Sequence, residues 1–128
     1  SDAAIESVAA RELSELERRE QLYRGTRPAP EISGHDLILV DDGIATGSTV
    51  RAAVMALRQL DAARIVVATP VVALSTAREL RREVDELVTV MIPASFNAVG
   101  QWYEDFSQTT DEEVRELLAR SRGFSAPK

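Results

Sequence analysis

Apolar side chains are spaced along the middle of the chain as short strands that alternate with helices. Apolar runs of strand length occur at 37–40, 64–69 and 87–92. Residues 48–60 place apolar side chains on one helical face, and Thr76 with Glu79 has the spacing of a capping box that starts a helix at 76–83. Because such alternation forms βαβ units, the pattern predicts an α/β domain with at least three parallel strands. The unbroken run at 37–40 predicts a strand that is buried on both faces.

Both ends of the chain are predicted to be helical. Residues 3–23 carry a narrow apolar stripe, which consists of Ile5, Val8, Ala9, Leu13 and Leu16. A loop rich in Pro, Gly and Ser follows at 25–35. A second loop runs from 93 to about 110 and leads into a helix at 111–120 that has three carboxylates in its first turn, where they suit the helix dipole. We expect residues 121–128 to form a frayed tail.

Length and composition narrow the functional classes. The chain has 128 residues, so we expect a single domain over 1–128, with a flexible helix and loop at 1–30, a core at 36–92, a loop at 93–110 and a final helix at 111–120. No Cys is present, which excludes disulfides, thiolate metal sites and a Cys nucleophile, and the single His35 cannot build a histidine metal site. No apolar stretch approaches the ~20 residues of a membrane span, and no leader opens the chain, so we expect a cytoplasmic protein.

The charged residues narrow the choice of ligands. The net charge of −6 argues against nucleic-acid binding, which calls for a basic surface. Lys128 is the only lysine, so every internal cation is an arginine. Schiff-base chemistry and general-base catalysis by an internal lysine are therefore excluded.

The segment at 37–49 carries the main chemical signal. It reads as an apolar strand, an acidic pair (Asp41 and Asp42), and a run of small residues that leads into a helix near Ser48. In open α/β sheets ligands bind at the carboxyl ends of strands, and a small-residue turn before a helix can aim its N–H groups at a phosphate. A purely structural explanation is that Asp41 and Asp42 end the strand while residues 46–49 only cap the helix.

This segment resembles the phosphoribosyl-pyrophosphate motif of the type I phosphoribosyltransferases, whose fold is a three-layer α/β/α arrangement around a parallel sheet. The resemblance implies that Asp41 and Asp42 are catalytic residues that hold the ribose 2- and 3-hydroxyls. It implies that the 5-phosphate is bound by Ala45, Thr46, Gly47, Ser48 and Thr49. Mg²⁺ would bridge the ribose hydroxyls and the pyrophosphate, and the substrates would be phosphoribosyl pyrophosphate and a base or nucleotide. Gly43 replaces a residue that is commonly aliphatic, and we expect it to loosen the turn.

A second part of the resemblance lies at 92–105. This segment is similar, with one extra residue, to the base-binding loop of hypoxanthine–guanine phosphoribosyltransferases. Phe96 would stack on the base, and backbone groups of Ala98 and Val99 would read its edge. Ala45 stands where those enzymes carry an Asp, and residues 68–72 supply no Lys for a 6-oxo group. We expect a nitrogenous base of purine type but do not identify it; for Trp102 and Phe106 we favour simple packing.

Arginines before the motif form a third group. Arg18, Arg19 and Arg24 lie where the family has a mobile segment that closes over the pyrophosphate. A charged helix face in contact with solvent explains the same arginines equally well.

The resemblance covers only the later part of the family's fold, because the first two strands of that fold have no counterpart in this sequence. We expect the edge of the 37–40 strand to pair with another chain, as in a homodimer, or with a segment outside this sequence.

Two rival functions belong to other classes. A phosphoacceptor receiver domain needs an internal Lys and a further Asp at the end of a strand, and this chain lacks both. A non-catalytic protein that binds phosphoribosyl pyrophosphate as a regulatory signal fits the motif as well as an enzyme does.

Overall fold

A computed structural model describes residues 2–122, except for the side chains of residues 5, 8, 9, 12, 13 and 16. The apolar stripe predicted for the first helix consists of five of those side chains, so it lies outside the described residues. The chain divides into two compact units, one of residues 30–106 and the other of residues 1–29 with 107–128. Each unit is described by itself.

The unit at 30–106 is built on a parallel sheet of three strands, β1 (Asp36–Val40), β2 (Arg64–Val71) and β3 (Glu86–Met91), in the order β1-β2-β3. The register pairs Leu37 with Ile65 and Val67 with Leu87. Helix α2 (Ser48–Gln59) connects β1 to β2, and helix α3 (Leu74–Glu83) connects β2 to β3. The predicted α/β class with parallel strands is confirmed, and the strand boundaries agree with the apolar runs to within two residues.

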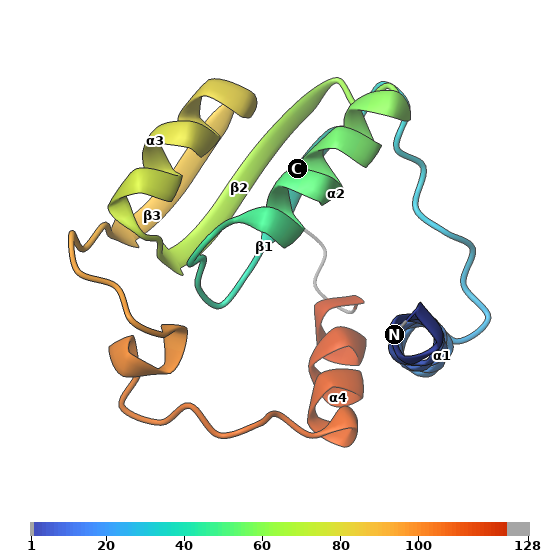
Figure 1. Ribbon diagram of the computed structural model, residues 1–128. Helices are drawn as coiled ribbons and strands as arrows, with labels where there is room; N and C mark the ends of the chain where they lie inside the picture. The colour runs from blue at the N-terminus through green and yellow to red at the C-terminus, as the bar shows by residue number, and fades with distance from the viewer. Residues whose placement is uncertain (1, 123–128) are drawn as a thin grey trace. The chain divides into compact units, whose positions relative to one another are not determined.

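Helices α2 and α3 lie along the same face of the sheet (Figure 1). Their apolar sides meet the inward side chains of the strands in one buried cluster, centred on Ile65, Val67, Val54 and Leu80. Ile65, Val67 and Leu80 are completely buried. Burying side chains of this size stabilises the fold by about 1.5–3 kcal/mol each.

The opposite face of the sheet is exposed, so the prediction that 37–40 is buried on both faces is wrong. Ile38 is 67% exposed and Val40 79%, and on β3 the corresponding values are 49% for Val88 and 85% for Val90. The reason is the topology: both crossover helices cover the same face, and side chains alternate along a strand. An unbroken apolar run therefore places every second side chain on the exposed face.

Helix α3 begins two residues earlier than the sequence predicted, and the Thr76/Glu79 capping box is wrong. Its N-cap is Ala73, which makes no side-chain cap bond. Thr76 lies inside the helix, and its hydroxyl donates to the Ala45 carbonyl. A hydroxyl buried among other elements can reach a distant carbonyl that sequence spacing does not reveal.

The other unit contains helix α1 (Asp2–Arg24) and helix α4 (Asp111–Arg122). A capping box occurs here, at α4: the Glu113 amide donates to Thr110 Oγ1 (3.2 Å), and the Thr110 amide donates to the Glu113 carboxylate (3.4 Å). The helix thus starts at the predicted residue. None of the helices within residues 2–122 has the length and apolar character needed to cross a membrane.

The exposed sheet face generates the first prediction. An apolar face of this kind favours association, so we expect light scattering to give a mass above 14.0 kDa that rises with protein concentration. Val40→Thr with Val90→Thr keeps the shape of both side chains but makes them polar, and should weaken association by about tenfold or more. Val50→Thr, at a buried position on helix α2, is the control for general destabilisation. A folded wild-type monomer at every concentration would contradict this prediction.

Candidate functional site

The segment after β1 continues beside β2 to the carboxyl edge of the sheet. The Asp41 amide donates to the Ala68 carbonyl (3.1 Å), and the Ile44 amide donates to the Val71 carbonyl (2.9 Å). Ile44 is buried, and its carbonyl accepts from the Ala73 amide (3.0 Å). These bonds fix the backbone before and after Asp42, and they place the acidic pair where ligands bind in open α/β sheets.

The turn at 45–49 presents its residues to solvent. Ala45, Thr46, Ser48 and Thr49 are exposed, whereas Gly47 is buried. Gly47 has φ +77°, a left-handed conformation that other residues rarely adopt, and no side chain caps α2 at this position. The Ser48 amide, the first of α2, donates to Thr46 Oγ1 (3.4 Å) within the turn. The positive end of the α2 dipole lies at this turn, an arrangement that suits an anion.

A cavity of about 180 Å³ brings several of the predicted site residues together. Its lining consists of Asp41, residues 43–50 and Val99. The five residues of the turn thus line one cavity together with Asp41 and with one of the three residues predicted for base binding. Asp42, Phe96 and Ala98 are not part of this lining.

The two carboxylates interact with each other. The pKa of the Asp42 carboxyl is raised above its ordinary value, mainly because partial loss of hydration disfavours its charged form. A hydrogen bond with Asp41 and the like charge of Asp41 act in the same direction, while the backbone amides of Asp42 and Gly43 oppose the shift. Ionisation of Asp42 beside Asp41 therefore costs free energy, and a bound cation or a hydroxyl donor would lower that cost.

Among the described residues, no cationic side chain lines this cavity. Arg51, in the first turns of α2, bonds instead to carboxylates of α3, Glu79 at 3.1 Å and Glu83. An anion in the turn would be held by backbone amides and hydroxyls, among them the Thr46 and Ser48 hydroxyls, whose oxygens are 3.2 Å apart.

Gly43 permits a close contact with the predicted base-binding segment. A Cβ atom at residue 43 would lie 2.5 Å from Val99 Cγ1 and 3.1 Å from Val71 Cγ1. Val99 begins a short 3₁₀ helix, η1 (Val99–Trp102), and therefore packs directly on the backbone of the acidic segment. The expectation that Gly43 loosens the turn is wrong, since the space left by the absent side chain is filled by Val99.

A second contact joins the same two segments. The Tyr103 hydroxyl donates to the Asp42 carbonyl. The Tyr103 ring also packs against Phe106, with centroids 5.1 Å apart. Tyr103 lies within the 92–105 segment, but the sequence does not reveal this bond, because it spans 61 positions.

Phe96 and Trp102 lie close to each other, with centroids 6.1 Å apart at 39°. Phe96 is half-buried and Ala98 is exposed. The Trp102 indole nitrogen is buried without a hydrogen-bond partner in the described part of the chain. The packing role favoured for Trp102 agrees with this contact, and base stacking by Phe96 stays a prediction.

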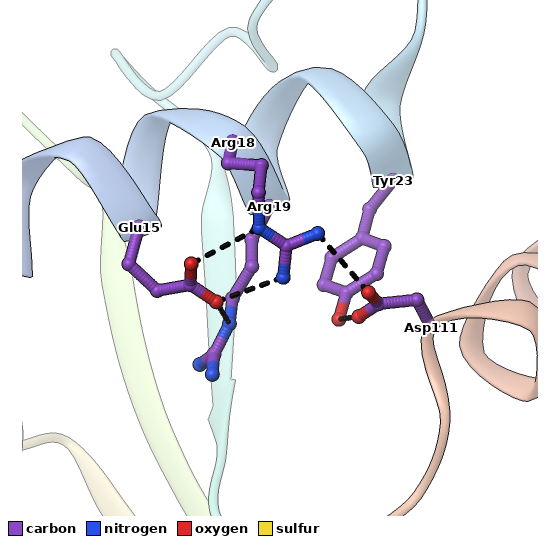
Figure 2. A network of polar contacts seen from close by, with 5 residues as sticks. All are labelled: Glu15, Arg18, Arg19, Tyr23 and Asp111. Carbon is purple, nitrogen blue, oxygen red and sulfur yellow. Dashed lines mark hydrogen bonds and ion pairs between the residues drawn. The ribbon is translucent and has the colours of Figure 1, made fainter.

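The arginines of the predicted closing segment are engaged with carboxylates of their own unit. Arg18 bonds to Glu15 (2.8 Å) and Asp111 (3.1 Å), and Arg19 bonds to Glu15 (3.0 Å), as Figure 2 shows. Arg24 pairs with Glu20 at 2.7 Å. Their contact with pyrophosphate stays a prediction, and it would require these ion pairs to exchange.

Asp111 is the centre of this network. It accepts from Arg18 and from the Tyr23 hydroxyl (2.7 Å), so it links α1 to the first turn of α4 (Figure 2). The hydrogen bond from Tyr23, followed by that from Arg18, lowers the pKa of Asp111. The same bond raises the pKa of Tyr23, and the Arg18 hydrogen bond is the main cause that lowers the pKa of Glu15 to about 2.

The fold and the edge position of the acidic pair define a parallel α/β domain with its candidate site at the carboxyl ends of the strands. A family model described as "Phosphoribosyl transferase domain" matches residues 3–107, and the chain belongs to this family. The resemblance stated from residues 37–49 is thereby confirmed.

Relatives and a solved structure agree with this assignment. Two Mycobacterium tuberculosis proteins, "Putative phosphoribosyl transferase Rv0571c" of strain H37Rv and "Putative phosphoribosyl transferase MT0597" of strain CDC 1551, are each 39% identical over 119 residues. The match covers 93% of this chain and 27% of each relative. The crystal structure of TT1426 from Thermus thermophilus is similar with a TM-score of 0.75 and 38% identity, over 94% of this chain and 57% of that one. The chain thus spans about a quarter of its curated relatives.

The contact between Gly43 and Val99 generates a prediction on stability. Gly43→Ala should lower the free energy of unfolding by about 1–3 kcal/mol, because its Cβ overlaps Val99. Val99→Ala in the same chain removes the clashing methyl groups, so the double variant should lose less than the sum of the two single variants. Denaturant unfolding followed by the fluorescence of Trp102 measures both effects. Strict additivity would show that the two residues do not touch.

The network around Asp111 generates a prediction on titration. Asp111→Asn should move the ionisation of Tyr23 to lower pH, because the accepting carboxylate that raises its pKa is gone. Ultraviolet absorbance of tyrosinate measures this in a Tyr103→Phe background, where Tyr23 is the remaining tyrosine. Glu116→Gln removes another α4 carboxylate, which pairs with Arg120, and should leave the curve unchanged. Equal curves for Asp111→Asn and its parent would refute the assignment.

Proposed function

We propose that this domain binds phosphoribosyl pyrophosphate and belongs to an enzyme that transfers the 5-phosphoribosyl group between this donor and a nitrogenous base, expected to be of purine type. Family membership supports the reaction class. The observation that carries the proposal is the shared cavity, which is lined by Asp41 and by the turn at 45–49.

The turn at 45–49 is proposed to hold the 5-phosphate. Its support is the left-handed Gly47, the position of the turn at the N-terminus of α2, and the hydroxyl side chains of the exposed residues Thr46, Ser48 and Thr49. Amide donors arranged in a turn at a helix N-terminus bind phosphate without a formal positive charge.

Asp41 and Asp42 are proposed to accept hydrogen bonds from the ribose 2- and 3-hydroxyls. Two adjacent carboxylates that repel each other are also a suitable donor set for Mg²⁺, which prefers oxygen ligands and completes its shell with substrate oxygens. When bound, Mg²⁺ would neutralise charge on the pyrophosphate leaving group. The residues of this chain that would hold it are Asp41 and Asp42.

The transfer exchanges one bond at the anomeric carbon. The C1–O bond to pyrophosphate breaks with its electron pair leaving on pyrophosphate, a ring nitrogen of the base forms the new C1–N bond, and that nitrogen gives its proton to water or to the departing pyrophosphate. Positive charge develops on the sugar ring as the first bond breaks. Fixed carboxylates beside the ring stabilise that charge electrostatically.

The segment at 96–99 is proposed to receive the base. Val99 is supported best, since it lines the cavity and packs on Gly43. Phe96 would supply a stacking face, and the exposed backbone at Ala98 would supply hydrogen-bonding groups. Ala45 offers no carboxylate to the base, so this chain would rely on backbone groups to recognise its edge.

Titration calorimetry with phosphoribosyl pyrophosphate and Mg²⁺ tests the proposal. Asp42→Asn should weaken donor binding by roughly tenfold or more, because charge-assisted hydrogen bonds contribute about 1.5–3 kcal/mol each. Asp36→Asn removes an exposed carboxylate at the other end of β1 and is the matched control. Saturable binding by the wild type with selective loss in Asp42→Asn is the expected result, and no binding by the wild type would overturn the proposal.

Stability measurements separate lost binding from unfolding. Because the pKa of Asp42 is raised in the native state, its ionisation costs stability as pH rises from below its ordinary value through the native-state value. Asp42→Asn removes this cost, so at neutral pH it should melt no lower than the wild type.

A base screen for pyrophosphate release, run on a full-length protein that carries this domain, distinguishes enzyme from regulatory protein. Release with one base supports transfer. Tight binding without release would favour the non-catalytic alternative, in which the same site serves as a sensor.

A further inference from the structure

One buried hydroxyl outside the motif contacts the turn at 45–49 from the side of α3. Thr76, on the first turn of α3, is 3% exposed, and its hydroxyl donates to the Ala45 carbonyl. Only one other polar residue in the described part of the chain is buried, Thr69, whose hydroxyl bonds within its own strand. The Thr76 bond instead joins elements 31 positions apart.

This bond fixes the orientation of a peptide plane in the turn. The Ala45 carbonyl and the Thr46 amide belong to one planar peptide group, and no cis bond occurs in the described residues. In a trans peptide the C=O and N–H point in opposite directions. When Thr76 holds the Ala45 carbonyl, the Thr46 N–H is therefore directed away from α3.

The Thr76 methyl group supports the turn at a second point. A Cβ atom on Gly47 would lie 2.7 Å from Thr76 Cγ2, so the methyl packs against the left-handed glycine. Arg51 adds a third link, because its bonds to Glu79 and Glu83 connect α2 to α3. Both branches of the Thr76 side chain thus contact the backbone of the turn, the hydroxyl at Ala45 and the methyl group at Gly47.

We propose that Thr76 is a positioning residue for the turn at 45–49. By donating a hydrogen bond to the Ala45 carbonyl, it orients the Thr46 amide toward a phosphate bound in the cavity. This inference rests on the proposed function, in which the turn binds the 5-phosphate. Thr76 itself does not line the cavity, so in this role it acts through the turn and not by contact with the phosphate.

The variant pair Thr76→Ser and Thr76→Ala tests the hydroxyl directly, since both lack the methyl group and only Ser keeps the O–H. Titration calorimetry with ribose 5-phosphate and the 128-residue chain measures binding at the turn without Mg²⁺ or pyrophosphate. We expect Thr76→Ala to bind roughly threefold to tenfold more weakly than Thr76→Ser, the loss that one net hydrogen bond gives. Thr76→Val has nearly the shape of the wild-type side chain but lacks the hydroxyl, and it should bind ribose 5-phosphate more weakly than the wild type by a similar factor.

A second measurement reports orientation in the free protein. The Thr46 amide resonance in a ¹H–¹⁵N spectrum should shift in Thr76→Ala and Thr76→Val, and should stay near its position in Thr76→Ser. Thr69→Val is the control for loss of a buried threonine hydroxyl, because the Thr69 hydroxyl bonds to Val71 within β2 (3.2 Å). It should lower the melting temperature without shifting Thr46 or weakening ribose 5-phosphate binding.

The outcomes separate the two claims. If the wild type binds neither ribose 5-phosphate nor phosphoribosyl pyrophosphate, the proposed function fails, and the Thr46 resonance still decides whether Thr76 positions the turn. If the wild type binds but Thr76→Ser and Thr76→Ala bind equally, with the same Thr46 resonance, the positioning role is wrong. Equal loss of binding in Thr69→Val would also overturn it, since general destabilisation would then explain the effect.

Discussion

Close contact of the β1–α2 turn with two later segments of the chain controls the geometry of the candidate site. Gly43 lets Val99 approach from η1, and Gly47 lets Thr76 approach from α3. Both contacts are closer than a side chain at either glycine would allow. The Ala45 and Asp42 carbonyls are held by Thr76 and Tyr103 across the same two contacts. The turn is therefore shaped from outside by residues that do not belong to its motif.

The topology of the sheet makes this arrangement possible. With the strand order β1-β2-β3 and both crossover helices on one face, the start of α3 lies beside the start of α2, at the carboxyl ends of the strands. The buried cluster on that face anchors both helices, while the other face of the sheet keeps its apolar side chains exposed. Stability and site geometry in this unit thus depend on the same packed layer.

The acidic pair at the candidate site differs electrostatically from the arginine–carboxylate pairs found in both units. The pKa of Asp42 is raised, mainly by partial loss of hydration and further by its hydrogen bond with Asp41 and the like charge of that residue. Carboxylates paired with arginine show the opposite shift: the pKa values of Glu15 and Asp111 are lowered in the unit of α1 and α4, and that of Asp85 is lowered in the unit at 30–106. A carboxyl whose pKa is raised in the folded protein costs stability when it ionises, which is typical of sites that bind a ligand.

The sequence by itself determined the α/β class, the order of the elements and the membership of the acidic pair and the turn in one motif. These properties depend on local features: the apolar period of a strand or helix, and a run of consecutive residues after β1. The sequence predicts helix boundaries less well, as Thr76 shows. Its hydroxyl could accept from a nearby amide as a helix cap, but in the structure it donates to the Ala45 carbonyl.

Only the tertiary structure decided which face of the sheet is covered, what fills the space at Gly43, and which residues outside the motif contact the turn. Each of these depends on contacts between positions far apart in the chain, such as the 61 positions between Asp42 and Tyr103. Apolar spacing along one strand is the same whether a helix covers the second face or not. Long-range packing is what distinguishes those cases, and it has no signature in a local stretch of sequence.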